Sequence, residues 1–162
     1  MRKIKYLALV VFLIMPSITV EARSYVDEET PIEVQIACDK YGAEYGICPE
    51  LLEAICWQES RFDESVIDGT GECYGLMQIK KSCHKKRMQD LGVTDLGDID
   101  SNVHVGADYL RELFDDYEDA GIVLGLYHGE SNAVERGQSG NLSDYVTRVL
   151  ENSERLERLH GK

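Results

Sequence analysis

A helix near the middle of the chain places a carboxylate on an apolar face. Residues 54–63 read AICWQESRFD. In a helix that includes them, four apolar side chains fall on one stripe at three- and four-residue spacings: Leu52, Ile55, Cys56 and Phe62. Glu59 lies in the middle of this stripe. A Glu that faces a core or cleft loses hydration, and its protonated form is then favoured near neutral pH. The spacing therefore predicts a general acid at Glu59.

Two other interpretations of Glu59 stay open from the spacing alone. The residue is near the end of its predicted helix, where a solvated carboxylate needs no function. A nearby cation such as Arg61 also offers a structural ion pair, and such pairs perturb carboxylates as active sites do.

The first 22 residues are organised like an export signal. Three basic residues precede an apolar run over 6–15, and the small residues Val20 and Ala22 follow on either side of Glu21. We expect a signal peptide over 1–22, cleaved after Ala22. The alternative is an uncleaved N-terminal anchor, for which the apolar run is short. With either, the chain is expected to be exported and to be secreted or associated with the cell envelope.

The remaining length predicts one domain with an acidic surface. We expect a short linker over 23–29, the domain over 30–152 and a charged tail over 153–162, fraying after Glu151. Removal of 1–22 lowers the formal net charge from −13 to −15, because three basic residues and one acidic residue are lost. This charge disfavours nucleic acid and anionic membranes, which bind through Lys and Arg. A glycan, recognised through hydroxyl and amide groups, is compatible with it.

Five cysteines lie within the exported part of the chain: Cys38, Cys48, Cys56, Cys73 and Cys83. Export permits disulfides, and the odd number leaves at least one thiol unpaired. Cys56, on the apolar stripe, is the candidate for a buried free thiol. Of the three ways to pair the others, we favour Cys48–Cys73 with Cys38–Cys83. No C-x-x-C or H-E-x-x-H spacing is present and the four His are scattered, so we expect no metal site.

The pattern of apolar residues predicts a mostly helical domain. A capping box with Pro31 at the first helical position opens a helix that runs to about Tyr41. Gly42 and Gly46 separate it from a helix over about 49–61. The short apolar stretch 74–80 predicts a strand or an irregular core segment. Further helices are expected over 102–117, over 120–128 and from 143 onward, with loops over 91–100 and 129–141. Residues 81–90 are strongly basic, and the patch over 81–87 is expected to be a solvated helix face; contact with an acidic peptide or a partner is the alternative.

Several short motifs follow one another in a recognisable order. They are Glu59-Ser60, GLMQI over 75–79, NVHVGADYL over 102–110, LYHG over 126–129 and Tyr145-Val146. This order resembles the catalytic domain of soluble lytic transglycosylases, the goose-type-lysozyme-like branch of the lysozyme superfamily, over roughly residues 30–150. The resemblance implies a mainly α, lysozyme-like α+β domain, with a very small β or irregular segment around 74–80 and a glycan-binding cleft.

The same resemblance implies roles for individual residues. Glu59 matches the catalytic acid/base, and no cofactor or metal is implied. Substrate-binding positions match Ser60, Gly75, Leu76, Met77, Gln78, Tyr127, His128 and Tyr145. Ordinary core packing is the alternative interpretation of Met77, Ile79 and Tyr127.

One motif departs from the family pattern. Where the family has A-Y-N-x-G, this chain has Leu126-Tyr127-His128-Gly129-Glu130. Either His128 replaces the Asn and Glu130 occupies the Gly position, or one residue is deleted and Gly129 is the family's Gly. We prefer the second alignment, because it keeps Gly at a turn that needs it.

The resemblance implies an exported enzyme that breaks the bond between N-acetylmuramic acid and N-acetylglucosamine in peptidoglycan, with a 1,6-anhydro product. The implied partners are peptidoglycan glycan strands and a cell-envelope assembly machinery, with the chain a monomer. One alternative is a hydrolytic muramidase whose second carboxylate is Asp68, Glu72 or Glu130. The other, favoured by the altered segment 127–130, is a non-catalytic glycan-binding or cell-wall assembly protein.

Overall fold

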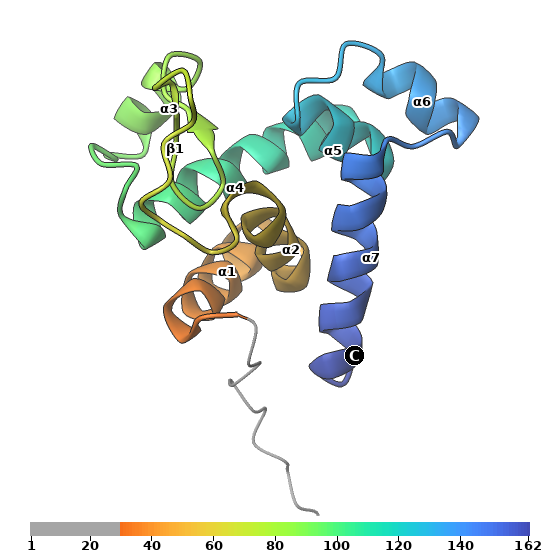
Figure 1. Cartoon of the computed structure of the whole chain (residues 1–162), viewed down its shortest axis with the longest axis horizontal. Coiled ribbons are helices and arrows are strands. Elements are labelled where there is room, and N and C mark those ends of the chain that lie inside the picture. Colours follow the sequence, from red (N-terminus) through yellow and green to blue (C-terminus); the bar gives the residue numbers. More distant parts are fainter. Residues whose placement is uncertain (1–29) are drawn as a thin grey trace, which may run out of the picture.

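The computed structural model describes residues 30–162, and the expectations for 1–22 and 23–29 lie outside these residues. In this range the elements are α1 (Ile32–Tyr45), α2 (Pro49–Ser60), β1 (Cys73–Tyr74), β2 (Ile79–Lys80), α3 (Lys85–Asp90), α4 (Ile99–Asp116), α5 (Ala120–Tyr127), α6 (Ala133–Ser139) and α7 (Asp144–Leu159). The hairpin and α3 form one lobe, and α5 and α6 form the other. Helix α4 runs between the lobes, with α1 and α2 below (Figure 1). The predicted fold class, mainly helical with a very small β segment, is confirmed.

No helix in residues 30–162 is both long enough and apolar enough to cross a bilayer.

The first helix is one turn longer than the pattern predicts. Helix α1 continues to Tyr45 and includes Gly42. A Cβ at Gly42 would come within 2.8 Å of the Ile47 carbonyl oxygen, so Gly allows a close contact here and does not end the helix. Gly46 ends the helix with φ of 66°, a left-handed conformation that Gly adopts without strain. The predicted capping box is not formed. The N-cap residue is Pro31, whose side chain has no cap hydrogen bond, and Gln35 Nε2 instead donates to the Thr30 carbonyl oxygen at 3.1 Å.

The predicted β segment is a minimal antiparallel hairpin. Tyr74 of β1 pairs with Ile79 of β2, so the GLMQ sequence forms the turn between the strands. Gly75 has φ of 71°, and a Cβ there would lie 2.4 Å from the Leu96 carbonyl oxygen. This position therefore requires Gly for both its conformation and its close contact.

A single buried carboxamide attaches this hairpin to α4. Asn102, 1 % exposed, accepts a hydrogen bond from the Met77 backbone N–H at 2.8 Å. Its amide nitrogen donates to the carbonyl oxygens of Tyr74 at 2.8 Å and Leu96 at 2.7 Å. Three backbone groups, two in the hairpin and one in the loop before α4, thus obtain their partners from one side chain.

The loop predicted over 129–141 is wrong, because residues 133–139 form α6. Its sequence, AVERGQS, offers few apolar side chains, so its periodicity gives no helix signal. The helix is held by close approach to α5. A Cβ at Gly125 would lie 2.8 Å from that of Ala133, and one at Gly137 would lie 2.3 Å from Ile122.

The basic segment 81–90 is only partly the solvated face that we expected. Lys86 is exposed and pairs with Asp90 at 2.6 Å. Arg87 is largely buried and pairs with both Asp108 and Glu112 of α4. This cation therefore fixes α3 on α4, which the run of like charges in the sequence did not indicate.

The expectation that the chain frays after Glu151 is wrong. Helix α7 continues to Leu159, and its Leu156 is buried against the core. Beyond it, His160 Nδ1 lies 2.8 Å and Lys162 Nζ 2.7 Å from the carboxylate of Glu50, which is fully buried at the start of α2. Buried contacts thus hold the segment that its charge assigned to solvent.

All five cysteines are free thiols in the structure, so neither favoured disulfide is formed. Cys48 lies at the start of α2, where its Sγ is 3.0 Å from a Glu50 carboxylate oxygen. Cys73 and Cys83 belong to the hairpin region instead, and Cys38 is fully buried in α1. Cys56 is fully buried as predicted.

We expect Asn102→Ala to lower the free energy of unfolding by about 3 kcal/mol, since three backbone hydrogen bonds are lost and two of them are buried. Urea denaturation followed by circular dichroism measures the change. Asn141→Ala is the matched control because its side chain is exposed, and it should change stability by less than about 0.5 kcal/mol. Equal effects of the two substitutions would contradict the anchoring role of Asn102.

Candidate active site

Glu59 lies in the last turn of α2, where the helix meets the space between the two lobes. Leu52, Ile55 and Cys56 of the predicted stripe are fully buried, and Phe62 is partly buried against the core. The helix ends at Ser60, one residue after Glu59, because Arg61 and Phe62 adopt left-handed φ values of 57° and 63°. The apolar face of the helix therefore supports a carboxylate at its edge.

The environment of Glu59 favours its protonated form. Burial raises the pKa of Glu59 above its ordinary value, while the hydrogen bond from Tyr145 and the charge of His128 lower it less strongly. The Tyr145 hydroxyl donates to Glu59 Oε1 at 2.6 Å. The His128 ring stacks on Tyr145 with centroids 3.8 Å apart and planes at 11°. Helix α7 and the end of α5 thus enclose the carboxylate that α2 presents.

Arg61 is not the ion-pair partner of Glu59. Its guanidinium lies 4.3 Å above the Trp57 ring, and Nη1 donates to the Trp57 carbonyl oxygen at 3.3 Å. The structural ion pair that the sequence left open is therefore absent.

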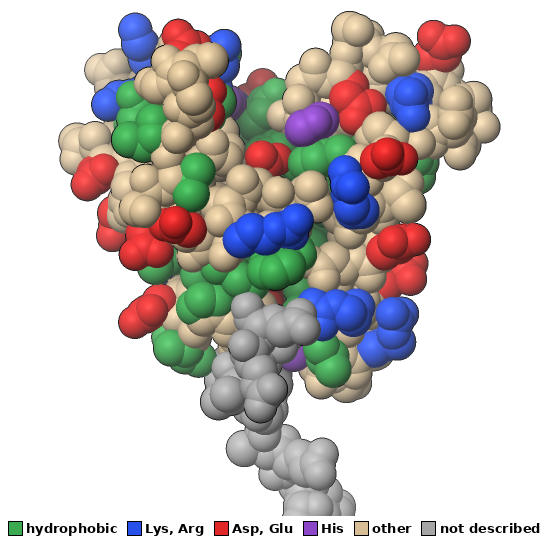
Figure 2. All heavy atoms as spheres, viewed as in Figure 1, with side chains coloured by type: hydrophobic (Ala, Val, Ile, Leu, Met, Phe, Trp, Pro, Cys, Tyr) green, Lys and Arg blue, Asp and Glu red, His purple; other side chains and the backbone are tan. Residues whose placement is uncertain are grey.

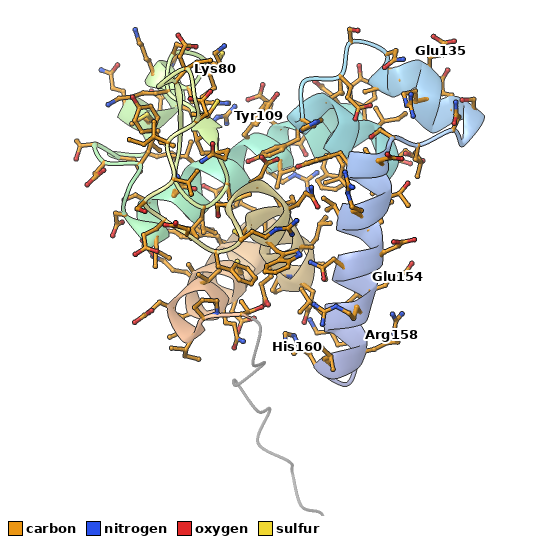
Figure 3. All side chains as sticks on the ribbon, viewed as in Figure 1. Lys80, Tyr109, Glu135, Glu154, Arg158 and His160 are labelled. Atoms are coloured by element: carbon orange, nitrogen blue, oxygen red, sulfur yellow. The ribbon has the colours of Figure 1, made fainter. Side chains whose placement is uncertain are left out.

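A cavity of about 460 Å³ opens beside Glu59. Its lining comes from α2, the loop before β1, the hairpin, the segment before α3, α4 and the end of α5. The residues are Glu59, Asp68, Cys73, Gln78, Ile79, Lys80, Cys83, His84, Tyr109, Leu126, Tyr127, His128 and Gly129. The space-filling view shows a hollow between the two lobes (Figure 2). Lys80 lies on the hairpin lobe and Tyr109 on α4 beside it, across the hollow from α6, which carries Glu135 (Figure 3).

The structure divides the predicted site residues into two groups. Glu59, Gln78, Tyr127 and His128 line the cavity, and Tyr145 reaches it through its bond to Glu59. The others support the walls and do not line the cavity: Ser60, Gly75, Leu76 and Met77. Leu76 and Met77 are fully buried, which agrees with the core-packing interpretation of Met77.

The hairpin turn holds Gln78 in a constrained conformation. Gln78 has φ of 48°, unusual for a residue with a side chain. Its Nε2 donates to the carbonyl oxygens of Val66 at 3.1 Å and Gly75 at 2.9 Å. The amide nitrogen is thus occupied by the turn, and Oε1 is the atom that Gln78 offers to a ligand in the cavity.

The altered segment after α5 keeps its turn at Gly129. Gly129 has φ of 84°, whereas Glu130 is not among the residues with positive φ. The Gly-requiring turn therefore falls where our preferred alignment put it. Tyr127 donates from its hydroxyl to the Met77 carbonyl oxygen at 2.8 Å, which joins the end of α5 to the hairpin.

One of the three candidate second carboxylates lines the cavity with Glu59. Asp68 accepts backbone N–H bonds from Glu72 at 2.8 Å and Cys73 at 3.0 Å, and these bonds, with that from Thr70, hold the pKa of Asp68 well below its ordinary value. Glu72 instead pairs with Lys80 at 3.0 Å. Glu130, the third candidate, accepts from the Ser143 hydroxyl at 2.5 Å and does not line the cavity.

Sequence reasoning did not identify the wall formed by His84 and Tyr109. Their rings lie 4.6 Å apart, and Tyr109 contacts Tyr127 at 5.6 Å. The available signal was Gly106, one turn before Tyr109. Met77 packs so closely on this Gly that a Cβ on Gly106 would lie 2.4 Å from the Met77 sulfur. This contact brings the face of α4 that carries Tyr109 to the hairpin.

In the described part of the chain, no three His, Cys, Asp or Glu side chains are grouped so that they could hold a metal ion.

Comparison with known proteins identifies the family. The model of the Transglycosylase SLT domain matches residues 37–143, and the chain belongs to this family. A transglycosylase of Enterobacteria phage PRD1 is 33% identical over 110 residues, covering 68% of this chain and 39% of that protein. A membrane-bound lytic murein transglycosylase F of Desulfosudis oleivorans is 34% identical over 89 residues, covering 53% and 18%. The chain thus spans well under half of either relative.

A solved structure shares the fold. An inactive mutant of the lytic transglycosylase Slt from Pseudomonas aeruginosa superposes with a TM-score of 0.55 at 18% identity. The match covers 77% of this chain and 22% of the Slt chain.

We expect Tyr145→Phe to raise the pKa of Glu59 further, because the lost hydrogen bond stabilises the ionised carboxylate. The titration of the Glu59 carboxyl carbon by NMR measures this shift. Tyr117→Phe, which lies outside the cavity lining, is the control and should leave the titration unchanged. A downward shift in Tyr145→Phe would contradict the geometry.

Proposed function

We propose that this domain cleaves the β-1,4 bond between N-acetylmuramic acid and N-acetylglucosamine in peptidoglycan, as a lytic transglycosylase. The observation that carries the proposal is Glu59, whose pKa is raised by burial at the edge of a cavity. Its position on α2, followed by the GLMQ turn, occurs in a chain of the SLT family. Fold alone does not define activity, and the proposal therefore depends on this residue and its surroundings.

In the proposed mechanism one carboxyl group acts twice. Protonated Glu59 donates its proton to the glycosidic oxygen, and the bond from that oxygen to C1 of the muramoyl residue breaks. The 2-acetamido group of the same sugar stabilises the positive charge that develops at C1. Ionised Glu59 then removes the proton of the C6 hydroxyl, whose oxygen bonds to C1 and closes the 1,6-anhydro ring. Tyr145 stabilises the ionised Glu59 between the two steps through its hydrogen bond at 2.6 Å.

The cavity walls supply the contacts that this substrate needs. We propose that Gln78 Oε1 accepts from an N–H or hydroxyl group of the glycan, and that His128 contacts the sugar beside Glu59. The ring faces of Tyr109 and Tyr127 offer apolar surface to the sugar rings. Because this substrate lies outside the cytoplasm, we also propose that the chain is exported to the cell envelope.

We expect Glu59→Gln to lower the release of muropeptides from purified peptidoglycan sacculi by about 10³-fold or more, since the proton donor is lost. Mass spectrometry of the products from the unchanged protein should show fragments lighter by one water than reducing muropeptides. Gln Oε1 can still accept from Tyr145, so the thermal midpoint of unfolding should stay close to that of the unchanged protein. An active Glu59→Gln protein would exclude this mechanism.

A hydrolytic muramidase is the second candidate function, and the position of Asp68 favours it. This residue lines the cavity that also contains Glu59, and the two environments shift their pKa values in opposite directions. A protonated acid and an ionised carboxylate in one cleft are the groups that a hydrolytic glycosidase requires.

The substitution Asp68→Asn distinguishes the two reactions. Asn Oδ1 can still accept the two backbone N–H bonds, so the turn is kept while the charge is removed. For a transglycosylase we expect a change in rate of less than about threefold and unchanged anhydro products. Reducing ends from the unchanged protein, lost in Asp68→Asn, would establish the muramidase instead.

A further inference from the structure

A second hollow, of about 400 Å³, lies between the end of α2 and one face of α7. We call it the arginine groove, and its lining is Trp57, Gln58, Arg61, Arg148, Glu151, Asn152 and Arg155. None of these side chains has a role in the mechanism above. Lys and Arg side chains appear over α2 and α7 below the hollow between the lobes (Figure 2).

The arginine groove is connected to Glu59 by helix geometry. On α7, Tyr145, Arg148, Asn152 and Arg155 follow one another at three- and four-residue spacings, so they share one face. The Tyr145 hydroxyl donates a hydrogen bond to Glu59, and Arg148 follows Tyr145 by about 4.5 Å along the helix axis. On α2, Trp57 and Gln58 immediately precede Glu59. The groove residues Gln58 and Arg148 therefore lie within one helical turn of Glu59 and of its partner Tyr145.

The charge of the groove is opposite to that of the chain. The whole sequence has a formal net charge of −13, yet three Arg and one Glu line this groove. Within residues 30–162, neither Arg61 nor Arg148 forms an ion pair. Arg155 donates to Asn152 Oδ1 at 2.8 Å, which fixes its guanidinium along the helix. Two positive charges are thus available to an anion.

The backbone at Arg61 has a strained conformation that fixes the position of its side chain. Arg61 and Phe62 both adopt left-handed φ, which disfavours residues with a side chain by about 1 kcal/mol or more each. This conformation keeps the guanidinium 4.3 Å above the Trp57 ring, where it lines the groove. Backbone strain of this kind persists where the surrounding structure enforces it, often at ligand sites.

We propose that the arginine groove binds carboxylates of the peptide stem attached to the glycan strand that occupies the cavity. This inference rests on the proposed function. Arg recognises carboxylates through paired N–H donors, and peptide stems carry several carboxylates. A stem attached to a sugar beside Glu59 starts at the end of the groove that Tyr145 marks. The groove thereby selects strands that still carry their peptides.

The test compares two substrates. One is peptidoglycan with intact stems, and the other is glycan strands from which an amidase has removed the stems. Arg148→Glu should lower the cleavage rate on stem-bearing strands about tenfold and leave the rate on stripped strands within about twofold. Arg61→Gln should act in the same direction but more weakly, because it removes a charge without reversing it.

Arg158→Glu is the matched control. Arg158 lies on α7, is exposed and pairs with Glu154 at 3.7 Å, but it does not line the groove (Figure 3). It should leave both rates within about twofold of those of the unchanged protein. Equal loss on both substrates in Arg148→Glu, or no loss on either, would overturn the proposal.

A binding measurement separates this inference from the proposed function. The free stem tetrapeptide is titrated into the Glu59→Gln protein, and the Arg side-chain N–H resonances are followed by NMR. Shifts at Arg61 and Arg148, with the Arg61 shift lost once Arg148→Glu is added to this protein, support the groove, even if the unchanged protein cleaves neither substrate. Binding of polyglutamate but not of the stem peptide would overturn the proposal in favour of an acidic protein partner.

Discussion

The buried carboxamide of Asn102 joins two backbone groups of the hairpin and one of the loop before α4 to the long helix. Met77, Tyr74 and Leu96 all lie outside helices or at the ends of very short strands, so their polar groups have no regular ladder to enter. A side chain with one acceptor oxygen and two donor hydrogens matches this requirement. Because the GLMQ turn is fixed on α4 in this way, Gln78 can hold a strained φ and still face the cavity. The wall opposite Glu59 depends on this one residue.

The chemistry of Glu59 arises from packing more than from neighbouring charge. Burial is the largest influence on its pKa, and the elements responsible are α2, which carries it, and α7, which covers it. Tyr145 and His128 then moderate the effect without cancelling it, through a hydrogen bond and a nearby imidazole. Such a carboxyl group can donate a proton and afterwards exist as an anion, which a single acid/base residue must do. The stacked pair Tyr145–His128 occupies the place where the family motif differs in this chain.

Much of this arrangement was predictable from residue patterns, and the exceptions have physical reasons. The apolar stripe of α2, the long helix around Val103 and the short β segment within 74–80 were correctly expected because their signals are local. Helix α6 and the end of α7 were missed because their stability comes from tertiary contacts: the close approach of Gly137 to Ile122, and the contacts of His160 and Lys162 with Glu50. The roles of His84 and Tyr109 in the cavity wall were missed for the same reason, since α3 and α4 meet there only in the folded chain.

Helices α5 and α6 pack closely at Gly125 and Gly137, and this packing makes both positions sensitive to mutation. Ala133 packs against Gly125, and Ile122 packs against Gly137, so closely that any larger residue at either Gly must push the helices apart. Helix α6 is followed by the short connection that carries Ser143, which caps α7 and bonds to Glu130. A displaced α6 therefore moves the start of α7, and Tyr145 with it. A random-mutagenesis screen for inactive protein would recover substitutions at Gly137 alongside those at Glu59, the proposed acid/base, although Gly137 does not line the cavity.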